Sequence, residues 1–161
     1  MTLVAVLACG AAAGIAQAQK GQPAPGDTVS QVSAEMVGEM LAQNGLQYTI
    51  TRDSWDDPMI QVTTGKSLPA QSFVVFFYDC DTSDRCEDLM LAATFPARGG
   101  VTAVNAWNSG ARWVRAYMQE DQTAVLEMDL NATGGIGYDN VRIMVNTYVG
   151  MASEFAAAVN P

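Results

Sequence analysis

The sequence predicts an α+β fold, in which helices pack on an antiparallel β-sheet. The chain has 161 residues, of which 49% are hydrophobic, enough for one domain with a sizeable core. Segments with the alternation of β-strands come in neighbouring pairs separated by turn residues. Other segments, above all the last one, repeat apolar residues at helical spacing. The expected order of elements is α-β-β-β-β-α-β-β-α.

The first expected helix covers residues 34–44. Ser33 suits the N-cap position, because its hydroxyl can accept a hydrogen bond from a free backbone amide of the first turn. Val32 and Val37 have the spacing of a hydrophobic staple, and Gly45 suits the end of the helix. Four apolar side chains are expected on one face: Met36, Val37, Met40 and Leu41.

Two pairs of strands are expected after this helix. Residues 46–52 and 59–64 alternate on either side of Asp56-Asp57-Pro58, which is a turn signal. The next two runs, 73–78 and 89–95, are rich in β-forming residues and flank the turn sequence DTSDR. They predict a second hairpin with a cysteine on each side of its turn.

The second half of the chain predicts a helix, two strands and a helix. VTAVNAWN, residues 101–108, predicts a short helix that ends at Gly110. Strands are expected over 111–120 and 123–131. The last helix is expected to begin after Gly137 as its N-cap. Its apolar residues follow helical spacing: Val141, Val145, Tyr148, Val149, Ala152, Phe155, Ala156 and Val159.

The N-terminal segment resembles an export signal. An uncharged apolar run leads to Ala16-Gln17-Ala18, whose small residues suit signal peptidase, so cleavage is expected near Ala18. No Lys or Arg precedes the run, which leaves the true start codon open, and Cys9 allows lipidation as an alternative. The expected organisation is a signal peptide over 1–18, a flexible linker over 19–31 and the folded domain over 32–161. The predicted location is periplasmic or otherwise exported.

Cys80 and Cys86 are separated by the five residues DTSDR. In an exported protein such a pair at the mouth of a hairpin predicts a disulfide, because oxidising compartments preserve it. Free thiols, a metal site and a redox pair remain alternatives. Zinc would need carboxylates as its other ligands, and a redox pair would be expected as C-x-x-C.

Charge and composition oppose several classes of function. The net charge is -9 at pH 7, which disfavours binding to nucleic acid. The sequence has no histidine, the usual general base and a common metal ligand. No metal or other cofactor is therefore expected. Beyond the N-terminal run, no apolar stretch has the ~20 residues of a membrane-spanning helix.

A cluster of polar and aromatic residues follows the middle of the chain, in NAWNSGARWVRAY. It forms a candidate binding patch, in which arginines could pair with anions and aromatic rings could contact a partner. We expect Trp113, Arg115 and Tyr117 to alternate on one side of a strand. Alternatively, the amides satisfy backbone groups and the rings belong to the core. The patch comprises Asn105, Trp107, Asn108, Arg112, Trp113, Arg115 and Tyr117.

Several of these motifs together resemble the YbjN domain family of bacterial proteins. The resemblance rests on YDCDTSDRCEDLMLAATF, VNAWNSGARWVRAY, VLEMDLNATGGIGYDNV and the last helix, and it spans about residues 32–158. Trp113 stands where Phe is expected, and Gly137 where a capping Ser or Thr is expected. The resemblance implies a fold similar to type III secretion chaperones, a regulatory role in sensory transduction, and no established reaction.

The expected function is that of an exported, non-enzymatic protein-binding or chaperone-like module. Its partner would be a protein or peptide bound at a sheet edge or in a groove. The chaperone analogy also suggests a homodimer. The alternative is a periplasmic hydrolase or lyase that uses paired carboxylates, either Asp56 with Asp57 or Glu127 with Asp129.

Overall fold

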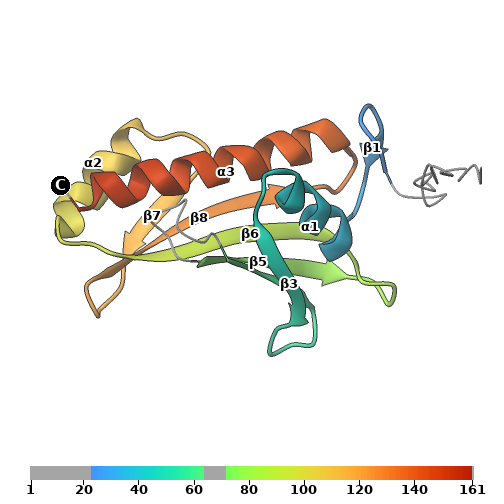
Figure 1. Ribbon diagram of the computed structural model, residues 1–161, viewed down its shortest axis with the longest axis horizontal. Coiled ribbons are helices and arrows are strands. Elements are labelled where there is room, and N and C mark those ends of the chain that lie inside the picture. Colours follow the sequence, from blue (N-terminus) through green and yellow to red (C-terminus); the bar gives the residue numbers. More distant parts are fainter. Residues whose placement is uncertain (1–22, 64–71, 161) are drawn as a thin grey trace, which may run out of the picture.

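The structure is a computed structural model that describes residues 23–63 and 72–160. One antiparallel sheet has the order β3-β4-β5-β6-β8-β7, and Figure 1 shows the helices on one side of it. The predicted α+β class is confirmed. The strands are β3 (Gln47–Arg52), β4 (Pro58–Thr63), β5 (Ser72–Cys80), β6 (Arg85–Pro96), β7 (Arg115–Met118) and β8 (Thr123–Asn131). The helices are α1 (Ala34–Gln43), α2 (Gly100–Gly110) and α3 (Tyr138–Ala158).

Three very short strands complete the fold and were not predicted. β2 (Val32–Ser33) pairs with β6, where Val32 lies opposite Cys86. β1 (Thr28–Val29) pairs with β9 (Ile136–Gly137), so part of the segment expected as a linker is a strand. Two-residue strands carry too little alternation to be recognised in a sequence.

α1 begins as predicted. The Ser33 hydroxyl accepts a hydrogen bond from the Met36 amide at 3.3 Å. Gly38 lies on the buried side of this helix, and a Cβ atom added there would lie 2.5 Å from the Tyr48 ring. The absence of a side chain at Gly38 therefore lets α1 approach β3 closely.

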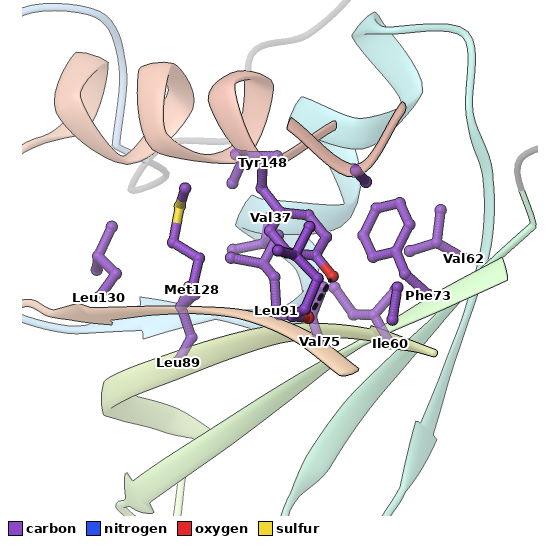
Figure 2. Packing of buried hydrophobic residues seen from close by; sticks show 14 of the residues in the cluster. Val37, Ile60, Val62, Phe73, Val75, Leu89, Leu91, Met128, Leu130 and Tyr148 are labelled. Atoms are coloured by element: carbon purple, nitrogen blue, oxygen red, sulfur yellow. Dashed lines mark hydrogen bonds between the residues drawn. The ribbon is translucent and has the colours of Figure 1, made fainter. Parts of the chain in front are cut away.

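The core fills the space between the helices and the sheet, as Figure 2 shows. Tyr148 of α3 is fully buried there, and its ring packs edge-on against Phe73 with centroids 5.4 Å apart. Its hydroxyl donates a hydrogen bond to the Leu126 carbonyl at 3.1 Å. Burial, with a smaller contribution from the charge of Glu127, strongly raises the pKa of this phenol.

No helix in the described ranges has the length and apolar character needed to cross a bilayer.

β7 differs from its prediction. It begins at Arg115 rather than at 111, because Trp113 has a left-handed backbone with φ of 73°. A strand cannot continue through that conformation, so the chain turns away from the sheet before Arg115.

Candidate functional site

Two hollows lie along α3. The first has a volume of about 620 Å³ and lies between α2, the turn that follows it and the second half of α3. Its lining residues are Ala103, Ala106, Trp107, Gly110, Ala111, Arg112, Trp113, Met151, Glu154 and Ala158. The second has a volume of about 530 Å³ and lies between the end of β8 and the first half of α3. Its lining residues are Trp113, Asp129, Leu130, Asn131, Ile136, Asn140, Ile143, Met144 and Thr147.

Both hollows follow one stripe of α3. The helical residues that line them recur every three or four positions, so they share a face adjacent to the buried one. Trp113 lines both hollows and separates them. We call the two hollows together the α3 groove. Several of its apolar side chains are open to solvent, with Ile143 53% and Trp113 63% exposed.

The turn at Trp113 holds this ring out from the sheet. The left-handed backbone at Trp113 directs the chain away from the line of β7. The Arg112 guanidinium lies over the indole, with its central carbon 5.2 Å from the ring centroid. Such a cation–π contact at an exposed site contributes about 0.5–1 kcal/mol and favours one ring position.

Trp107 forms the floor of the first hollow. Its ring packs edge-on against Phe155 of α3, with centroids 5.3 Å apart. The indole N–H is buried and has no hydrogen-bond partner in the described part of the chain. An unpaired buried donor is unfavourable for folding.

The structure divides the predicted patch into four parts, of which three lie on or near α2. Trp107, Arg112 and Trp113 line the groove. The Asn108 side chain instead bonds the backbone of β7, donating to the Ala116 carbonyl at 2.8 Å and accepting from its amide at 3.0 Å. Asn105 is exposed on α2.

Arg115 and Tyr117 lie on the sheet face that carries no helix. The prediction that Trp113 shares their side of a strand is wrong, because β7 begins after it. Arg115 pairs with Glu127 at 2.8 Å and also with Asp129, and the Tyr117 hydroxyl donates to Glu127 at 2.8 Å. The hydrogen bond to Asp129 is the main cause that raises the pKa of Arg115. The hydrogen bond to Glu127 is the main cause that raises the pKa of Tyr117.

The carboxylate pairs considered for catalysis lie in this network and in a turn. Glu127, at 8% exposure, is the only buried charged residue in the described ranges, and it shares Arg115 with Asp129. Asp56 and Asp57 lie in the β3–β4 turn, where the Asp56 carboxylate is 3.7 Å from Arg52. Neither pair lines the α3 groove except through Asp129. No cluster of three or more potential metal ligands occurs in residues 23–63 and 72–160.

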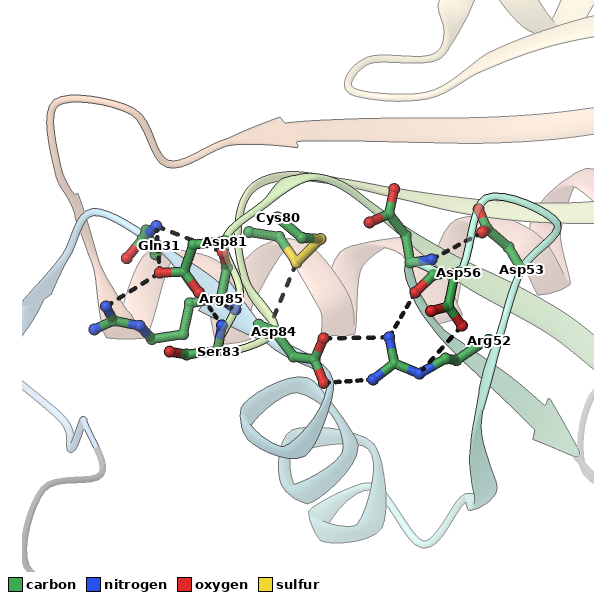
Figure 3. The surroundings of a disulfide bond; sticks show 11 residues. Gln31, Arg52, Asp53, Asp56, Cys80, Asp81, Ser83, Asp84 and Arg85 are labelled. Atoms are coloured by element: carbon green, nitrogen blue, oxygen red, sulfur yellow. Dashed lines mark hydrogen bonds and ion pairs between the residues drawn. A yellow bond between two sulfur atoms is a disulfide. The ribbon is translucent and has the colours of Figure 1, made fainter.

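The cysteine hairpin is a compact, cross-linked element, shown in Figure 3. A disulfide joins Cys80 and Cys86, whose Cα atoms are 3.9 Å apart at paired positions of β5 and β6. The Asp81 carboxylate accepts hydrogen bonds from the amides of Ser83 and Arg85. The bond from the Ser83 amide is the main cause that lowers the pKa of Asp81. The turn residues therefore hold the hairpin in shape as well as contacting solvent.

Asp84 connects this hairpin to its neighbour. Both of its carboxylate oxygens accept from Arg52 at the end of β3, at 3.2 and 2.7 Å. The two hairpin ends are thus tied by a bidentate ion pair, which is the strongest geometry for an arginine and a carboxylate.

The model of the YbjN family, described as "Putative bacterial sensory transduction regulator", matches residues 33–161. No curated protein matches the sequence. The crystal structure of YbjN from E. coli has a TM-score of 0.55 and 14% identity, covering 83% of this chain and 92% of that chain. At this identity the likeness shows the fold alone.

A second solved structure is that of the type III secretion chaperone SycH from Yersinia pestis, in complex with a stable fragment of YscM2. It has a TM-score of 0.45 and 14% identity, covering 76% of this chain and 98% of that chain.

Proposed function

The chain belongs to the YbjN family, and from this premise we propose that it is an exported, non-enzymatic module that binds a protein partner in the α3 groove. The regulatory role in the family's description is compatible with such binding, because a regulator can act through a partner and needs no catalysis of its own.

The observation that carries this proposal is the groove itself. It follows much of α3, is lined mainly by apolar and aromatic side chains, and has Trp113 at its centre. Interfaces concentrate their binding energy in aromatic anchors surrounded by apolar contacts, and Trp113 offers such an anchor at 63% exposure. A long open groove suits a peptide segment better than a small metabolite, which usually occupies an enclosed pocket.

Export is supported by two features. The N-terminal 18 residues have the apolar run and the small-residue site of a signal peptide. The Cys80–Cys86 disulfide is of a kind that persists in oxidising compartments.

The test of the groove is affinity capture from a periplasmic extract under non-reducing conditions, followed by mass spectrometry. The bait is compared with its Trp113→Ser variant and with Trp55→Ser as the matched control. Trp55 is 85% exposed in the β3–β4 turn, away from the groove. We expect a partner whose recovery falls roughly tenfold with Trp113→Ser and is unchanged with Trp55→Ser. Equal recovery with both variants would contradict binding in the groove.

A further inference from the structure

One stretch of β8 has an unpaired edge. β7 pairs with β8 only between Ala124 and Glu127. On that side, the last residues of β8, from Met128 to Asn131, have no strand partner among residues 23–63 and 72–160. The cause is the left-handed turn at Trp113, because of which β7 begins only at Arg115.

The alternation of backbone groups shows which residues face this edge. The Thr123 carbonyl accepts from the residue after β7 at 2.8 Å, so Thr123 faces β7. The Ala132 amide donates to Glu87 at 2.8 Å, so Ala132 faces β6. Since main-chain groups alternate in direction along a strand, the N–H and C=O groups of Asp129 and Asn131 point to the unpaired side.

The second hollow lies directly beside these groups. Asp129 and Asn131 line it, together with Ile143 and Met144 of α3. The Leu130 side chain points to the helix side, where it is buried. A residue paired opposite Leu130 would therefore direct its side chain toward α3 and into this apolar hollow.

The side chains of Asp129 and Asn131 lie on the other face of the sheet. Near them are the carboxylates of Asp88, Glu127 and Asp129, with Arg115 as the cation that pairs with the last two. The net charge of this cluster is negative, as is that of the whole chain at -9. Residues paired opposite Asp129 and Asn131 are therefore favoured when basic.

We propose that the edge of β8 from Asp129 to Asn131 is a strand-addition site for an extended peptide with the pattern basic–apolar–basic. The peptide continues the line of β7 and runs antiparallel to β8. Its basic residues lie opposite Asp129 and Asn131 and form the main-chain hydrogen bonds, while its apolar residue enters the hollow beside Ile143 and Met144. This inference rests on the proposed function and adds the class of partner.

Other edges of the sheet lack this combination. The outer edge of β7 is covered at Ala116 by the Asn108 side chain, which takes both backbone groups. The outer edge of β3 adjoins a smaller hollow lined mostly by polar groups, among them Gln47, Thr49 and Thr63. The β8 edge is the one with free backbone groups next to an apolar hollow in the described ranges.

The first experiment selects ligands from a phage library of random 12-residue peptides on the purified protein. Ile143→Asp places a charge in the hollow, and Val101→Asp is the matched control. Ile143 and Val101 have similar exposures, 53% and 60%, but Val101 lines neither part of the groove. We expect peptides with the basic–apolar–basic pattern whose affinity falls about tenfold with Ile143→Asp and is unchanged with Val101→Asp. If no peptide is enriched, or only peptides of another pattern, the proposal is wrong.

The second experiment tests the backbone pairing with N-methylated copies of a selected peptide. Methylation of the basic residues removes the N–H groups that face β8, so affinity should fall about tenfold. Methylation of the apolar residue should have little effect, because its N–H points away from β8. Hydrogen exchange of the Asp129 and Asn131 amides should also slow when the unmodified peptide binds.

The outcomes separate this inference from the proposed function. Peptides that bind in the groove but tolerate either methylation would overturn strand addition and leave groove binding intact. If Trp113→Ser abolishes capture of the partner but no peptide ligand is selected, strand addition is likewise overturned and groove binding is left intact. If the free protein is a dimer in which both amides are already protected, a second copy occupies the edge and the peptide proposal fails.

Discussion

At the scale of single residues, two buried polar groups differ in how the fold accommodates them. The Glu127 carboxylate is paired with Arg115 and Tyr117 on the sheet face that carries no helix. Tyr148 remains neutral in the core and needs only the Leu126 carbonyl as a partner. A buried phenol that must stay protonated couples stability to pH.

Tyr148 should make the protein less stable in alkaline solution. In the unfolded chain this phenol ionises near pH 10, whereas burial keeps its folded-state pKa well above that value. Its contribution is therefore complete below about pH 10 and decreases as the pH rises further, by up to about 1.4 kcal/mol per pH unit. Tyr148→Phe should cost about 1 kcal/mol at pH 8 through the lost hydrogen bond.

Urea unfolding at pH 8 and pH 11 measures this effect in both proteins. The free energy of unfolding should fall less for Tyr148→Phe than for the wild type between the two values. Equal losses would mean that another group is responsible.

The contacts of Glu127 with Arg115 and Tyr117, on the sheet face without helices, give a second prediction at this scale. Arg115→Met leaves Glu127 with the Tyr117 hydroxyl as its remaining partner, so the variant should lose about 1–3 kcal/mol of stability. Glu127→Gln/Arg115→Met should recover part of this loss, because no unpaired charge remains. Urea unfolding of the two single variants and the double variant measures these losses. If the losses of the single variants add up in the double variant, Arg115 and Glu127 are not coupled.

At the scale of elements, much could be predicted from the sequence. Ser33 capping, the position of Gly137 before α3 and the order of the main helices and strands follow from local chemistry that the structure confirms. The family resemblance is confirmed over residues 33–161. These features depend on neighbours in sequence, which explains why sequence patterns reveal them.

The groove was only partly predictable. Trp107, Arg112 and Trp113 were recognised as binding candidates, but Ile143, Met144 and Met151 were not. Their face of α3 becomes a groove wall only because Trp113 leaves the sheet and α2 packs beside the helix. A left-handed tryptophan is rare, so alternation in the sequence gave no sign that β7 would begin late.

The close contact of α1 with β3 predicts opposite effects for one substitution in two backgrounds. Gly38→Ala should destabilise the wild type by about 1–2 kcal/mol, because the new Cβ must displace the Tyr48 ring. In a Tyr48→Val background the same change should stabilise by up to about 1 kcal/mol, since alanine favours a helix. Urea unfolding of the four proteins tests this, and an effect of the same sign in both backgrounds would refute it.

The cysteine hairpin predicts sensitivity to reductant. Closing so short a loop contributes about 2 kcal/mol on the chain-entropy estimate. The wild type should therefore unfold at a lower urea concentration in the presence of a thiol reductant, whereas Cys80→Ala/Cys86→Ala should not respond. If thiol titration shows that both cysteines are reduced and the urea midpoint of the wild type is still unchanged, the disulfide does not contribute to stability.

At the scale of the whole molecule, the proposed location outside the cytoplasm is one in which the Cys80–Cys86 disulfide would persist. The net charge of -9 opposes nucleic-acid binding, and a partner with basic segments would complement it. The homodimer inferred by analogy stays a prediction, which light scattering of the purified protein can test.

Export predicts a defined mature N-terminus. Protein recovered from the periplasmic fraction should begin at Gln19, and Ala18→Leu should slow processing because the cleavage site needs a small residue. Ala24→Leu, beyond that site, is the matched control. Recovery of the unprocessed chain from the cytoplasmic fraction alone would refute export.

The two hydrogen bonds between Asn108 and Ala116 have a consequence for how copies of this protein behave in a crowded compartment. The Asn108 amide takes both outward backbone groups of Ala116, which disfavours edge-to-edge pairing of β7 with a strand of another molecule. Protection of the β7 edge thus favours solubility, while Asp129 to Asn131 of β8 stay accessible to a peptide partner.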